Sequence, residues 1–80
     1  MTPTERAFII IEALPEELRQ KLKKELAYWA PEVVLPYVNG FVNTHVPKSA
    51  NDSTSVKVYA AVCGVSEDSM KIQMILDGYL

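Results

Sequence analysis

The chain has little of the two residue types that most often build metal and nucleophile sites. Its 80 residues include one cysteine, Cys63, and one histidine, His45. One cysteine excludes an internal disulfide and is typical of a reducing compartment. One cysteine and one histidine cannot complete a tetrahedral zinc site, and no local motif indicates that they form a thiolate–imidazole pair. We therefore expect no metal, no cofactor and no enzymatic activity.

The chain also lacks a basic excess and a long apolar run. It carries eight Lys and Arg against ten Asp and Glu, for a formal net charge of −2. That balance disfavours electrostatic binding to nucleic acid or to anionic lipid. Its apolar runs are far shorter than the ~18 residues that span a bilayer, and residues 1–14 have no basic region of the kind that begins a signal peptide. We expect a cytoplasmic protein with no membrane segment.

Glycine is scarce as well, with three residues far apart in the sequence, which excludes a glycine-rich phosphate loop. They are Gly40, Gly64 and Gly78. What the chain has in abundance is apolar side chains, at 49% of its residues. A single domain over residues 1–80 buries only a modest core. We therefore expect part of the apolar surplus to contact another protein or a second copy of the chain.

Residues Pro15–Trp29 are predicted to form an amphipathic helix that ends near Ala30. Apolar residues recur at helical spacing along one stripe, which must be covered by other elements. They are Leu18, Leu22, Leu26 and Trp29. The opposite side is polar and mostly cationic, with Arg19, Gln20, Lys21, Lys23 and Lys24. Before it, Thr2 and Pro3 predict the start of a helix that runs to about Ala13.

Two segments fit either helix or strand. In residues 33–46, apolar residues recur at helical spacing, but Asn39-Gly40 is a strong hairpin signal and Pro36 disfavours both structures. In residues 55–63, apolar residues fit a helical face and strand alternation equally well. We favour an all-α bundle of four or five short helices. The alternative is an α+β fold with a small antiparallel sheet from about 33–46 and 55–63.

The segment 59–77 resembles a helix-turn-helix. Gly64 suits the turn and Ser66 suits the cap of the second helix, which is expected to run to about Asp77. In that arrangement Ala60, Val65 and Met70 would pack in the core. The second helix would share one apolar face, with two methionines beside it. That face contains Ile72, Ile75, Leu76 and Tyr79, and the methionines are Met70 and Met74.

The chemistry of this second helix disfavours DNA. Glu67 and Asp68 stand at the end that would approach phosphates, and Lys71 is its only cation. Specific contacts to guanine need arginine or lysine. A DNA-binding regulator is therefore the alternative function.

The leading hypothesis is a non-enzymatic interaction or regulatory module that binds another protein or itself. Aromatic residues are the expected anchors, because they supply much contact area at low entropic cost. These are Tyr28, Trp29, Tyr37, Phe41 and Tyr79. Arg19, Lys23 and Lys24 are the expected charged rim. Leu80 offers a further apolar contact at the end of the chain.

Overall fold

The computed structural model describes residues 2–26 and 30–80. Within those residues it contains five α-helices and no strand. They are α1 (Pro3–Ala13), α2 (Glu16–Leu26), α3 (Pro31–His45), α4 (Ser53–Cys63) and α5 (Glu67–Leu76). The all-α prediction is confirmed. The α+β alternative is wrong, because residues 33–46 fall almost entirely within α3 and residues 55–63 within α4.

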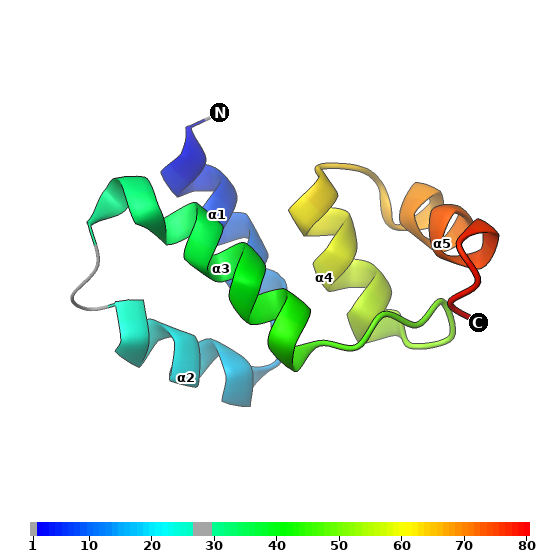
Figure 1. Cartoon of the computed structure of the whole chain (residues 1–80), viewed down its shortest axis with the longest axis horizontal. Helices are drawn as coiled ribbons and strands as arrows, with labels where there is room; N and C mark the ends of the chain where they lie inside the picture. The colour runs from blue at the N-terminus through cyan, green and yellow to red at the C-terminus, as the bar shows by residue number, and fades with distance from the viewer. Residues whose placement is uncertain (1, 27–29) are drawn as a thin grey trace.

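α1 packs against three of the other helices, α2, α3 and α4, and only α5 lies apart from it (Figure 1). α1 lies mainly against α3 and α4, α2 also packs against α3, and α5 packs mainly against α4. A hydrogen bond from the Arg6 guanidinium to the Val62 carbonyl, at 2.8 Å, also ties α1 to α4. The molecule measures 37 × 26 × 16 Å, and α5 forms one end of its long axis.

Local capping fixes where three of the helices begin. The hydroxyl of Thr2 accepts the Glu5 amide at 3.1 Å, and the Asp52 carboxylate accepts the Thr54 amide at 2.9 Å. The Ser66 hydroxyl accepts the Ser69 amide at 3.1 Å. Each side chain satisfies an amide that has no partner within its helix. The starts predicted at Thr2 and Ser66 are therefore confirmed.

α3 is a helix despite the proline and glycine within it. Pro36 removes one backbone donor, yet the helix continues to His45. The reason is tertiary: Val38 and Val42 are fully buried, and Phe41 is 6% exposed. Helical spacing brings these three residues to one side, where α1 and α2 cover them. A hairpin at Asn39-Gly40 would have divided this apolar surface between two strands.

The core joins all five helices. Its largest fully buried residues come from α1, α2, α3 and α4, and α5 contributes two methionines. They are Ile10, Leu22, Val38, Val42 and Val58, with Met70 and Met74. Leu18 and Leu26 pack against this core. The stripe expected on the second helix is thus confirmed as far as Leu26, and Trp29 lies outside the described residues.

The last helix is buried through its methionines, and Ala60 and Met70 pack in the core as expected. Met70 and Met74 are 8% and 2% exposed and face α4, whereas Ile72, Ile75 and Leu76 are 60%, 41% and 76% exposed. Both sides are apolar, and a helix packed on one neighbour can bury only one of them. Val65 is 46% exposed, so the expectation that it packs in the core is wrong.

The turn between α4 and α5 explains the position of Val65. Gly64 adopts a left-handed conformation with φ of 70°, which ends α4. The Val65 amide then donates to the Ala60 carbonyl at 3.1 Å. This bond holds the backbone of Val65 beside the end of α4 while its side chain stays exposed.

No helix among the described residues has the length and hydropathy that crossing a membrane requires.

Candidate docking surfaces

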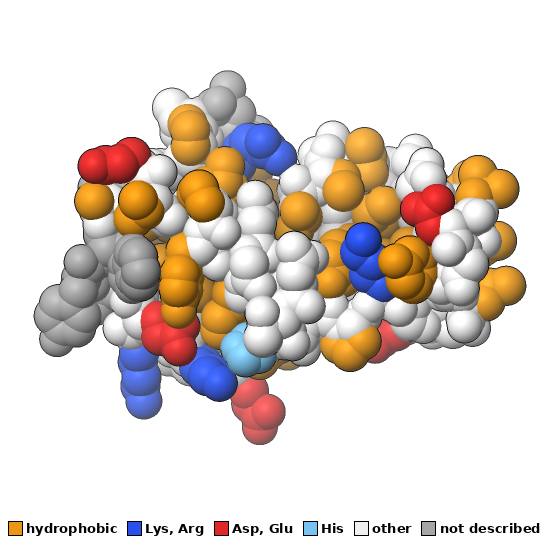
Figure 2. All heavy atoms as spheres, in the orientation of Figure 1, with side chains coloured by type: hydrophobic (Ala, Val, Ile, Leu, Met, Phe, Trp, Pro, Cys, Tyr) orange, Lys and Arg blue, Asp and Glu red, His pale blue; other side chains and the backbone are white. Residues whose placement is uncertain are grey.

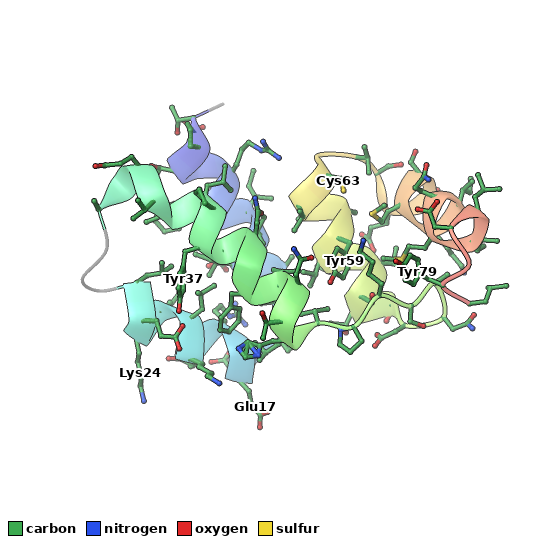
Figure 3. All side chains as sticks on the ribbon, viewed as in Figure 1. Glu17, Lys24, Tyr37, Tyr59, Cys63 and Tyr79 are labelled. Carbon is green, nitrogen blue, oxygen red and sulfur yellow. The ribbon has the colours of Figure 1, made fainter. Side chains whose placement is uncertain are left out.

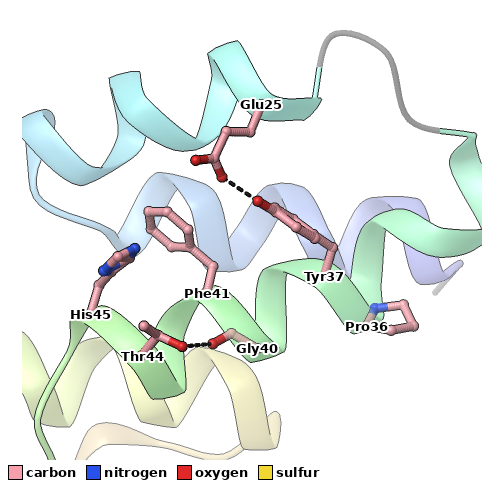
Figure 4. Close-up of a pocket in the computed structure, with 7 residues that line it drawn as sticks. All are labelled: Glu25, Pro36, Tyr37, Gly40, Phe41, Thr44 and His45. Atoms are coloured by element: carbon pink, nitrogen blue, oxygen red, sulfur yellow. Dashed lines mark hydrogen bonds between the residues drawn. The ribbon is translucent and has the colours of Figure 1, made fainter.

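A groove between α2 and α3 contains two of the predicted anchors, Tyr37 and Phe41 (Figure 4). It has a volume of about 410 Å³. Its lining is part aromatic and part polar. The residues are Glu25, Pro36, Tyr37, Gly40, Phe41, Thr44 and His45. Successive turns of α3 supply the aromatic rings, because residues 37, 41 and 45 recur every fourth position.

The polar groups of this groove bind one another. The Tyr37 hydroxyl donates a hydrogen bond to the Glu25 carboxylate across the groove. That bond, together with burial and the negative charge of Glu25, raises the pKa of Tyr37. The Thr44 hydroxyl donates to the Gly40 carbonyl at 2.9 Å within α3. The Tyr37–Glu25 bond therefore links α2 to α3.

Phe41 and His45 pack together at the other end of the groove. Their ring centroids lie 4.2 Å apart with the planes at 71°, an edge-to-face contact. Phe41 is only 6% exposed. Its ring therefore belongs to the core and offers little area to a partner.

The predicted cationic rim divides into Arg19, which is ion-paired, and two lysines that form no ion pair with another described residue. Arg19 forms ion pairs with Glu16 at 2.8 Å and with Glu12 at 3.4 Å. Lys23 and Lys24 are exposed, and Figure 3 shows Lys24 pointing away from the body of the molecule. Arg19 is thus engaged in joining the start of α2 to the end of α1, whereas the two lysines face solvent.

Among the residues that the structure describes, the largest group of exposed apolar side chains lies at the α5 end of the molecule. Figure 2 shows hydrophobic side chains gathered along the edge that α5 forms. Three come from the helix at spacing i, i+3 and i+4, and two from the tail that follows it. We call this set the apolar end: Ile72, Ile75, Leu76, Tyr79 and Leu80, between 40% and 76% exposed.

The tail is fixed to the body of the protein. The Ala50 amide donates to the Tyr79 carbonyl at 2.6 Å, and the Tyr79 amide donates to the Met74 carbonyl at 2.9 Å. The Lys48 ammonium lies 5.3 Å from the ring centroid of Tyr79 and 5.4 Å from that of Tyr59. Such distances are within the range of cation–π attraction. Figure 3 shows Tyr59 on α4 and Tyr79 in the space between α4 and α5.

The predicted anchors do not form one cluster among the described residues. Tyr37 lies in the α2–α3 groove, Phe41 is buried beneath it, and Tyr79 lies at the apolar end. Tyr28 and Trp29 lie outside the described residues. The sequence reasoning did not select Ile72, Ile75 and Leu76 as contacts. The sequence pattern that could have identified them is the presence of apolar residues on two opposite sides of α5.

The described residues contain no group of three or more His, Cys, Asp or Glu that could hold a metal ion. His45 lines the α2–α3 groove, whereas Cys63 is exposed and lines a small cavity beside α5. The two residues therefore lie at separate cavities.

α4, α5 and the turn that joins them present few groups that could read bases. The outer side of α5 carries Ile72, Ile75 and Leu76, all exposed. Glu67 and Asp68 are exposed at its first turn. The helix end that would meet phosphates is therefore acidic.

Comparisons with known proteins give no match: no protein-family model, no curated protein and no solved structure is significantly similar to the chain.

Proposed function

We propose that this protein is a non-enzymatic interaction module whose docking surface is the apolar end. One observation carries the proposal: Ile72, Ile75 and Leu76 stand side by side on α5, each more than 40% exposed. Their i, i+3 and i+4 spacing is how a helix presents anchors to a partner. A cytoplasmic location, inferred from the single cysteine, is part of the same proposal.

The apolar end is a better docking surface than the α2–α3 groove. In the groove, Phe41 is 6% exposed and the Tyr37 hydroxyl already binds Glu25. At the apolar end, Leu76 and Leu80 are 76% and 73% exposed. Burying such side chains in a partner removes apolar surface from water, which is the main driving force of association.

DNA reading by segment 59–77 is the weaker proposal. It would place exposed Glu67 and Asp68 near phosphates, with Lys71 as the one cation of α5. A DNA complex held by phosphate contacts would weaken steeply with salt, whereas an apolar complex would not.

The test compares three forms of the chain as baits for protein partners. The first is the wild type, and the second is the double variant Ile72→Lys/Leu76→Lys. The third is Phe8→Lys, a matched control because Phe8 is 58% exposed on α1. Any partner, the chain itself included, is then purified and its binding measured directly.

The proposal predicts a partner that binds the wild type and the Phe8→Lys control but not the double variant. A partner that binds all three forms equally would show that the docking surface is not the apolar end. Binding to DNA alone, lost as salt rises, would replace the proposal with its alternative.

A further inference from the structure

The apolar end is large enough to be half of a dimer interface. A stable interface takes about 800 Å² from each partner, and some 56–65% of it, or about 500 Å², is apolar. The five residues of the apolar end are 40–76% exposed. The ring of Tyr79 packs against Lys48, so the dimer would bury the other four residues. At about 150 Å² for a fully exposed large apolar residue, these four leave on the order of 400 Å² uncovered. The apolar end therefore supplies most of the apolar area that one partner contributes.

The centre of this surface also meets the requirement for pairing with itself. In a two-fold interface the same patch faces its own copy, so a charge near the centre would meet a like charge. The residues at the centre, Ile72, Ile75 and Leu76, are uncharged. The charged residues of α5 lie off this face or at its beginning: Glu67, Asp68 and Lys71. The net charge of −2 adds little repulsion between two copies.

Shape favours the same arrangement. α5 forms one end of a body only 26 × 16 Å in cross-section. It packs mainly against α4, so its outer side stays free of the other helices. Two copies joined at this end would extend the long axis without bringing their α2 helices, which carry Lys21, Lys23 and Lys24, near each other.

We propose that the occupant of the apolar end is a second copy of this chain, which pairs through α5 about a two-fold axis. The proposal rests on the proposed function, because it names the partner of the same surface. In the dimer, Ile72, Ile75 and Leu76 of each copy pack against the same residues of the other, with Leu80 at the margin.

Sedimentation equilibrium over about 1 μM to 1 mM tests the proposal. Reducing agent is required, because Cys63 is exposed and could link two copies covalently. We expect a reversible monomer–dimer equilibrium for the wild type. The double variant Ile72→Lys/Leu76→Lys should raise the dissociation constant about 100-fold or more. Phe8→Lys should leave it unchanged. Circular dichroism should show that all three forms are folded, and Leu76→Ala replaces the double variant if that one unfolds.

Any of the following results would overturn the proposed dimer. A wild type that stays monomeric at about 1 mM has no second copy as its occupant. A double variant that dimerises as well as the wild type pairs through another face, as does a Phe8→Lys control that has lost the dimer. The proposed function fails separately, if no foreign partner distinguishes the wild type from the double variant either.

Discussion

At the scale of single residues, two glycines with equal space around them have opposite roles. A Cβ built on Gly40 or Gly64 would meet no atom within 4 Å, so neither position is constrained by packing. Gly40 lies within α3, and Gly64 ends α4 in a left-handed conformation with φ of 70°. Replacing either glycine by alanine therefore tests the backbone conformation at that position without introducing a steric clash.

Replacing each glycine by alanine should change stability in opposite directions. Gly64→Ala should destabilise the protein by about 1 kcal/mol, because a Cβ is strained in the left-handed region. Gly40→Ala should stabilise it by about 0.5–1 kcal/mol through helix propensity. Urea denaturation of both variants checks the signs. If Gly64→Ala also raised the free energy of unfolding, Gly64 would not hold its left-handed conformation in solution.

Tyr59 is a buried residue whose hydroxyl joins α4 to the end of α3. Its hydroxyl donates to the Val46 carbonyl at 2.5 Å, where α3 ends. Tyr59→Phe should lower the free energy of unfolding by about 1–2 kcal/mol, because that carbonyl loses its donor. Chemical denaturation at pH 7 measures the loss. An unchanged stability would mean that water replaces the hydroxyl.

The same residue makes stability depend on alkaline pH. Burial, and then the nearby Tyr79, raise the pKa of Tyr59 above its ordinary value of 10. The folded state thus holds this proton more tightly than the unfolded state does. Its stabilising effect is complete below pH 10 and is lost as pH rises through the folded pKa. Denaturation at several pH values should give a decline above pH 10 that is shallower in Tyr59→Phe, while Tyr37, whose pKa is also raised, keeps part of it.

At the scale of elements, α2 contributes one fully buried side chain to the core. Leu22 is fully buried, whereas Leu18 and Leu26 are partly buried against the core. Leu22→Ala should cost about 2–5 kcal/mol, the range for removing a buried leucine. Lys23→Ala, at the neighbouring exposed position, should change stability by less than about 0.5 kcal/mol. Thermal denaturation of the two variants compares them, and similar midpoints would contradict the packing of α2.

Element boundaries were predictable from the sequence wherever they depend on local chemistry. Thr2 and Ser66 cap helices, and Gly64 ends one, through bonds to residues a few positions away. The fold of residues 33–46 was harder to predict, because Asn39-Gly40 favours a hairpin locally. The burial of Val38 and Val42 by other helices decides in favour of a helix.

The buried side of α5 could not be predicted from periodicity. Met70 and Met74 lie on one side of the helix, and Ile72, Ile75 and Leu76 lie on the other. Both sides are apolar, so the sequence indicates two possible core faces. The choice depends on how α4 approaches the helix, which is a tertiary property. This is also why Ile72, Ile75 and Leu76 were not predicted as contacts, although Tyr79 and Leu80 were.

At the scale of the whole molecule, the fold is extended for its length. The radius of gyration is 12.5 Å, against about 11.6 Å expected for 80 residues. An extended shape leaves a larger share of apolar side chains at the surface than a sphere would. Part of the apolar surplus in the composition is found at the α5 end of the molecule, and other exposed apolar residues, such as Phe8 and Ile9, lie on α1.

A dimer joined at that end makes the melting temperature depend on protein concentration. Association stabilises the folded state by mass action. We expect the midpoint of the wild type to rise across a hundredfold increase in concentration, and that of Ile72→Lys/Leu76→Lys to stay constant. Calorimetry at two or three concentrations measures both. A midpoint of the wild type that does not move with concentration would argue against self-association.

The bond between the Ala50 amide and the Tyr79 carbonyl has a consequence for how the protein opens. This hydrogen bond joins the tail after α5 to the loop that follows α3. It must therefore break before α5 can separate from α4. Deuterium uptake would make this visible, since the amides of α5 should exchange sooner than those of α1, and sooner still once Tyr79 and Leu80 are removed. In that case unfolding of the protein would begin at α5.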